Sequence, residues 1–138
     1  MIRTTLFALT AGLAMALATA TATAPAFAAG DAAMGEKVFK KCKACHSLKA
    51  GKNKVGPSLA GVVGRKAGTA AKYKYSKSMK AAGAKGLVWN DETLDGYLKN
   101  PTKFLRSYLD DSKAKSKMAL KLKKGADREN VAAFLQGK

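Results

Sequence analysis

Two cysteines and one histidine stand within five consecutive residues, and the chain has no other residue of either type. Cys42, Cys45 and His46 form the pattern Cys-x-x-Cys-His, which is typical of covalent attachment of a c-type haem. Two thiols at this spacing lie on one helical turn and can reach the two vinyl groups of one haem. The imidazole that follows can then bind the iron. The sequence therefore predicts one covalently attached haem c, with His46 as an axial ligand of its iron.

Other uses of the two cysteines fit the chain less well. A Cys-x-x-Cys redox motif is expected beside a βαβ pattern, which the sequence lacks. A disulfide between Cys42 and Cys45 would close a very small loop of little structural value. A structural zinc site needs four ligands, and the chain offers only three of the soft kind that zinc prefers, two Cys and one His.

The ligand on the other face of the iron decides what such a haem does. An open position favours binding of small ligands or peroxidase chemistry, whereas a second strong ligand favours electron transfer because nothing else can react at the metal. After residue 28 the candidates are Met34, Met79 and Met118. Met34 lies on a helical pattern and is expected to pack in the core, and Met79 lies in a lysine-rich polar segment. Met118, in an expected loop, is the sixth ligand by elimination.

These residues need a fold that carries residue 118 back over residue 46. Apolar residues recur at helical spacing along short segments, and no run alternates convincingly at period two. Glycine-rich residues 47–68 indicate loops, Asn90 is a plausible helix N-cap, and Pro101 separates two helices. The prediction is one all-α domain, with helices at about 32–42, 76–82, 91–100, 101–108 and 126–136.

Residues 1–28 have the pattern of a cleaved secretory signal peptide. Arg3 gives a short positive region, residues 6–18 are almost wholly apolar, and Ala26 and Ala28 are the small residues that a signal peptidase reads. An uncleaved membrane anchor is the alternative, but the apolar stretch is short for a span of about 20 residues. Cleavage after Ala28 would leave residues 29–138 as a monohaem domain in the periplasm.

Positive charge dominates the composition, with 26 Lys and Arg against 9 Asp and Glu and a formal net charge of +17. Such an excess can indicate nucleic-acid binding. Only four of these residues are arginine and the chain carries an export pattern, so we expect no nucleic acid. We expect instead a docking face for acidic membrane complexes. It would consist of lysines near the haem edge: Lys41, Lys43, Lys52, Lys54, Lys117, Lys123 and Lys124.

Several separated motifs together resemble the class I c-type cytochromes, and more closely the bacterial cytochromes c2. Gly35 and Phe39 resemble the family's N-terminal helix, and Val131 and Phe134 resemble the C-terminal helix that crosses it. Residues 55–66 (VGPSLAGVVGRK) resemble the loop that follows haem attachment, and the resemblance spans nearly all of residues 29–138. It implies the cytochrome c fold, in which short helices wrap around one haem.

The resemblance also implies roles for single residues. The Pro57 carbonyl would accept a hydrogen bond from the His46 ring and so orient it. Tyr97 would lie near the sulfur of Met118, the axial ligand. The haem propionates would accept hydrogen bonds from Arg65, Tyr75 and Trp89. One departure is the loop before Met118, which is longer than in many relatives and lacks their proline.

By this resemblance the protein is a soluble, monomeric electron carrier of the periplasm and not an enzyme. It would pass one electron at a time from a bc1-type complex to a photosynthetic reaction centre or a terminal oxidase. The alternative is a five-coordinate haem protein that binds small ligands or acts as a peroxidase. A colourless purified protein would instead favour a secreted thiol or zinc protein without haem.

Overall fold

The computed structural model describes residues 29–138, and the proposed signal peptide lies outside the described residues. Five helices and no strand occur in this part of the chain, so the all-α prediction is confirmed. The helices are α1 (Ala32–Phe39), α2 (Lys77–Ala84), α3 (Asp91–Lys99), α4 (Pro101–Leu109) and α5 (Gly125–Gln136). None of them is long and apolar enough to cross a membrane.

Short polar residues begin four of these helices, as the side chains that cap helix N-termini should. Asp31 accepts from two backbone N–H groups of α1, and Ser76 accepts from the Met79 N–H in α2. Asn90 and Thr93 form a reciprocal capping box at α3. Asn100 caps α4, whose first residue is Pro101, the position at which proline costs a helix nothing.

The first helix is shorter than the sequence predicts. It ends at Phe39 rather than near residue 42. Beyond it the Cys42 N–H donates to the Phe39 carbonyl at 2.8 Å, and the Cys45 N–H donates to the Cys42 carbonyl at 3.1 Å. These i→i+3 bonds tighten the chain into consecutive turns. The prediction was wrong in extent because the apolar spacing continues through turns that are no longer α-helical.

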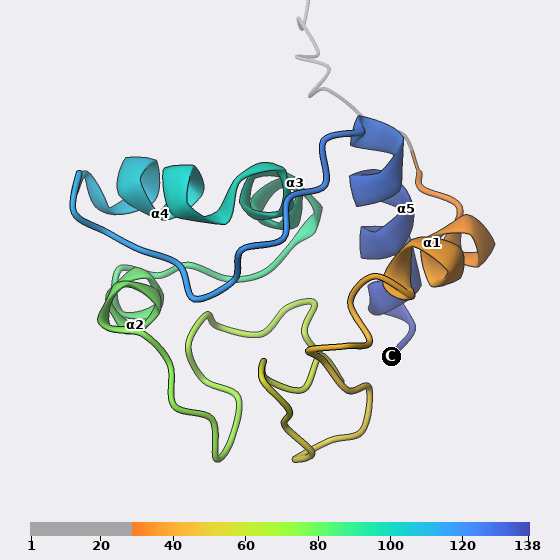
Figure 1. Cartoon of the computed structure of the whole chain (residues 1–138), viewed down its shortest axis with the longest axis horizontal. Coiled ribbons are helices and arrows are strands. Elements are labelled where there is room, and N and C mark those ends of the chain that lie inside the picture. The colour runs from red at the N-terminus through yellow and green to blue at the C-terminus, as the bar shows by residue number, and fades with distance from the viewer. Residues whose placement is uncertain (1–28) are drawn as a thin grey trace, which may run out of the picture.

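α1 and α5 cross closely on one side of the molecule (Figure 1). At the crossing Gly35 lies against the backbone of Asn130, where an added Cβ would overlap the Asn130 carbonyl oxygen. The rings of Phe39 and Phe134 pack beside it with centroids 5.3 Å apart. The crossing therefore fixes the start of the Cys-x-x-Cys-His motif, because the motif follows α1 directly.

Replacing Gly35 with Ala is expected to lower the free energy of unfolding by about 2 kcal/mol or more, because the obstacle is backbone and cannot rotate away. Thermal unfolding of the holoprotein measures the effect. Gly137→Ala is the matched control, since its nearest neighbour would be 4.0 Å away. Equal unfolding midpoints for the two variants would contradict the close crossing.

Candidate haem site

The helices and loops enclose a cavity of about 450 Å³, within the range of cofactor pockets. Residues far apart in the sequence line it, and α1 and α4 contribute none. All nine residues to which the sequence assigned a haem role line this one cavity: Cys42, Cys45, His46, Pro57, Arg65, Tyr75, Trp89, Tyr97 and Met118.

His46 is held from one side by the glycine-rich loop. Its Nδ1 lies 2.7 Å from the Pro57 carbonyl oxygen, so Nδ1–H donates and Nε2 keeps its lone pair. Gly56 permits this approach, because a Cβ there would overlap the imidazole ring. Burial lowers the pKa of His46, against the opposing effect of the Pro57 bond. The side chain is therefore neutral near pH 7, as a metal ligand must be.

Both cysteines are free thiols on the cavity wall. Cys42 is buried and Cys45 is exposed. Burial raises the pKa of Cys42 to about 11, so its thiol stays protonated at neutral pH until it reacts. Two thiols and one imidazole on consecutive turns thus face one apolar space, an arrangement that suits attachment of a flat apolar cofactor at its edge.

Met118 lines the same cavity, and Tyr97 lines it too. The hydroxyls of Tyr97 and Ser116 hydrogen-bond at 2.8 Å, and the Met118 N–H donates to the Ser116 Oγ at 3.0 Å. Burial raises the pKa of Tyr97, which keeps its phenol neutral. Ser116 was missed by sequence reasoning, and its only signal is its place two residues before Met118.

The other two methionines differ in their surroundings. Met34 is 44% exposed, so the prediction that it packs in the core is wrong. It lies outside the face of α1 formed by Gly35, Val38 and Phe39. Met79 is 8% exposed and lines the cavity, although lysines flank it in the sequence. Although α2 contains several polar residues, it buries the face that carries Met79, Ala82 and Gly83.

The three side chains expected around the propionates differ in their present partners. Arg65 donates from its two Nη atoms to the carbonyls of Ala60 and Ser58, at 3.0 and 2.9 Å, and so shapes that loop. The Tyr75 oxygen accepts from the Ala70 N–H at 3.2 Å, which leaves its own proton to donate. Trp89 is 7% exposed. Its ring packs edge-on against the ring of Tyr97, with the ring centroids 5.0 Å apart. Their bonds to propionates remain a prediction.

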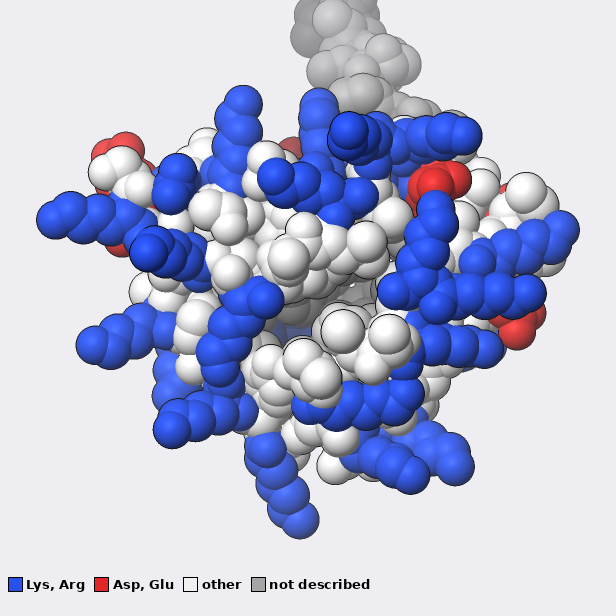
Figure 2. Space-filling view, viewed as in Figure 1, with Lys and Arg blue, Asp and Glu red and all other residues white. Residues whose placement is uncertain are grey.

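Basic side chains surround the mouth of the cavity. Figure 2 shows a hollow rimmed by uncharged residues and encircled by Lys and Arg, with few acids on this face. The seven lysines expected in the docking face are all exposed, and Lys41 and Lys117 also line the cavity. Lys41 pairs with Asp127 at 3.3 Å, and the Lys117 Nζ donates to the Lys74 carbonyl at 2.6 Å.

An all-α chain that surrounds an apolar cavity with a Cys-x-x-Cys-His turn defines a c-type haem protein. The family described as Cytochrome c matches residues 32–137, and the chain belongs to this family. Cytochrome c2 of Cereibacter sphaeroides is 51% identical over 116 residues, covering 78% of this chain and 94% of that protein. Cytochrome c2 of Rhodobacter capsulatus is 52% identical over 118 residues, covering 80% and 84%.

Solved structures agree with the sequence relatives. Cytochrome c2 from Rhodospirillum centenum superposes with a TM-score of 0.74 at 43% identity, covering 78% of this chain and 98% of that one. The resemblance to class I c-type cytochromes, and to cytochromes c2 among them, is thereby confirmed. So are the prediction of one covalently attached haem c with iron and the role in electron transport. The relatives are named cytochromes c2, which agrees with the prediction of an electron carrier.

Proposed function

We propose that this protein is a periplasmic one-electron carrier whose haem iron is bound by His46 and Met118. The observation that carries the proposal is that a neutral imidazole and a thioether from opposite ends of the described chain line one apolar cavity together with both attachment thiols. When bound, the haem supplies an iron that changes between ferric and ferrous states.

The protein's own groups would keep that change reversible. The Pro57 carbonyl orients His46 and makes its Nε2 a stronger ligand for the iron. Met118 would be the second protein ligand of the iron and would leave no site on it for a substrate. Buried side chains such as Trp89, Leu94 and Leu98 exclude water from the cavity walls and lower the local dielectric.

The setting of the carrier follows from the export pattern and the charge. Cleavage after Ala28 would release residues 29–138 into the periplasm as a monomer. Its donor would be a bc1-type complex, and its acceptor a photosynthetic reaction centre or a terminal oxidase. Acidic docking faces on these complexes would meet the exposed lysines around the cavity mouth and orient the haem edge toward the partner's cofactor.

Reversing a lysine at the cavity mouth should slow association with an acidic partner. Lys43 stands between the two attachment cysteines, and Lys43→Glu leaves the contacts of Lys41 and Lys117 intact. Charge steering can raise association rates by about 10–10³ at low salt, and screening reduces it as the Debye length falls to about 8 Å. We therefore expect a several-fold lower second-order rate and a flatter salt dependence, measured by flash or stopped-flow kinetics.

The matched control is Lys103→Glu, which makes the same charge reversal on α4. This helix does not line the cavity. The control should change the rate much less than Lys43→Glu. Equal slowing by the two reversals would mean that the lysines act as a general positive coat and form no directed docking face.

A further inference from the structure

The loop that carries Met118 has no proline, yet it is tied to the helices around it. After α4, Asp110 adopts the left-handed conformation (φ 54°), and Asp111 accepts the Lys113 N–H on its side chain at 2.8 Å. The chain then turns inward at Ala114, which is 1% exposed. We call residues 114–123 the Met118 segment, and Figure 1 shows the chain between α4 and α5 crossing the face of the molecule.

Upstream of Met118, two neighbouring helices hold the segment by side chains. The Nε of Arg106, in α4, donates to the Ala114 carbonyl at 3.1 Å. The Oγ of Ser78, in α2, accepts from the Lys115 N–H at 3.1 Å. The Thr102 Oγ1 accepts the Ser116 N–H at 3.4 Å, a longer and weaker contact. Consecutive residues 114–116 are thus each bound from outside the segment.

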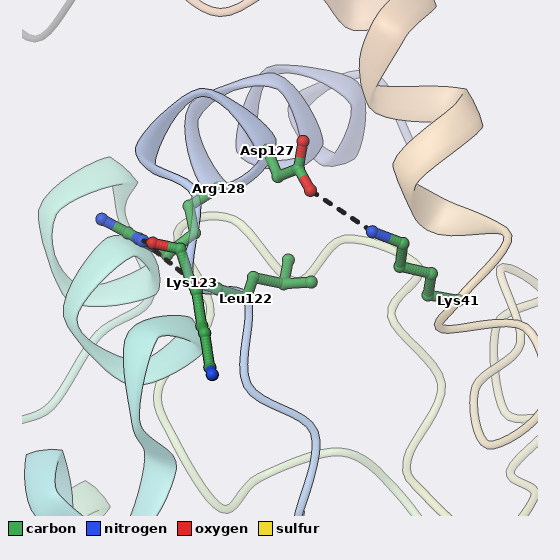
Figure 3. Close-up of polar contacts among 5 residues, drawn as sticks. All are labelled: Lys41, Leu122, Lys123, Asp127 and Arg128. Atoms are coloured by element: carbon green, nitrogen blue, oxygen red, sulfur yellow. Dashed lines mark hydrogen bonds and ion pairs between the residues drawn. The ribbon is translucent and has the colours of Figure 1, made fainter.

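Downstream of Met118 the anchoring is stronger. Arg128 is 8% exposed, and its Nη1 donates to the carbonyls of Leu122 and Lys123, both at 2.9 Å (Figure 3). Its Nε forms an ion pair with Asp95 at 2.7 Å. The Leu122 N–H also donates to the Leu98 carbonyl at 2.9 Å. Buried, charge-assisted bonds of this kind are worth more than solvent-accessible ones, so this end is the fixed one.

We propose that Ser78 and Arg106 are positioning residues for the Met118 thioether, which they act on through the backbone of residues 114 and 115. The inference rests on the proposed function, in which Met118 is the sixth ligand. Because the downstream end is fixed by Arg128, the thioether leaves the iron by movement of the upstream end, and that movement breaks the bonds to Ser78 and Arg106. These two side chains replace the stiffness that a proline would give the loop.

Imidazole binding to the ferric holoprotein tests this directly, because imidazole reaches the iron only after Met118 has left it. At saturating imidazole the stopped-flow rate equals the rate of Met118 departure. Ser78→Ala and Arg106→Met should each raise that limiting rate about three- to tenfold, the effect of losing one such hydrogen bond. If the two anchors act independently, their effects should multiply in the double variant.

Two variants control for stability and charge. Thr69→Val deletes a hydroxyl that donates to the Lys66 carbonyl. Among the described residues, this hydroxyl makes no hydrogen bond to the Met118 segment. Lys103→Met removes one positive charge from α4, as Arg106→Met does. Neither should change the limiting rate. Wild-type rates in Ser78→Ala and Arg106→Met, or equal increases in the two controls, would overturn the proposal.

A second background separates this inference from the proposed function. In Met118→Ala, imidazole should bind fast, and adding Ser78→Ala should change nothing further. If wild type bound imidazole as fast as Met118→Ala, the assignment of Met118 as ligand would fail. If Met118→Ala were fast, wild type slow and Ser78→Ala equally slow, the ligand assignment would hold and the positioning role alone would fail.

Discussion

Replacing Met118 with Ala should open the iron to external ligands. The ferric protein should lose the sulfur-to-iron charge-transfer band, and the ferrous protein should bind carbon monoxide, which the wild-type protein should exclude. The reduction potential should fall by on the order of 0.1 V or more, since axial ligands set haem potentials over roughly 0.8 V. Optical titration and carbon monoxide difference spectra measure both effects.

Met79→Ala is the sharpest control for this experiment. Met79 is the only other methionine that lines the cavity within residues 29–138, and it is 8% exposed. Its loss should cost packing but leave the charge-transfer band in place. A wild-type spectrum for Met118→Ala together with a lost band for Met79→Ala would reverse the assignment of the sixth ligand.

Without haem the chain should be largely unfolded. A cavity of about 450 Å³ lies among the core residues and would stand empty in the apoprotein. At about 24 cal/mol per Å³, an empty cavity of that size costs roughly 10 kcal/mol, and water entering its mouth reduces that figure. Domains are stable by only about 5–15 kcal/mol. A group that binds the native state alone therefore decides whether this chain folds.

The double variant Cys42→Ala, Cys45→Ala, produced without haem, tests this expectation by far-ultraviolet circular dichroism. It should show little of the helix seen in the holoprotein. Adding haem should restore helix, because His46 and Met118 remain to bind it. Native helix content before haem is added would show that the polypeptide alone supports the fold.

Local signals accounted for most of the architecture. Asn90 places the start of α3, and Pro101 places the boundary between α3 and α4, each to within a residue. Helical spacing overextended α1 because it does not distinguish a helix from consecutive turns. It also misplaced Met34, since spacing alone does not show that α5 packs against the face that contains Gly35 and Phe39.

The site was predictable where one motif specifies the chemistry, and less so where distant segments meet. Cys-x-x-Cys-His identified the attachment turn and His46 without reference to the fold. The bond between Ser78 and Lys115 joins residues 37 positions apart, and neither residue type is unusual in its own segment. Such contacts depend on how α2 and the Met118 segment pack, and local sequence does not specify that packing.

The most direct test of His46 and Met118 ligation in a one-electron carrier is a redox titration of the purified protein followed by absorption. A single reversible one-electron transition is expected, with a low-spin ferric spectrum whose sulfur-to-iron charge-transfer band disappears as the iron is reduced. A high-spin ferric spectrum without that band, and a ferrous form that binds carbon monoxide at once, would show an open iron and contradict the account.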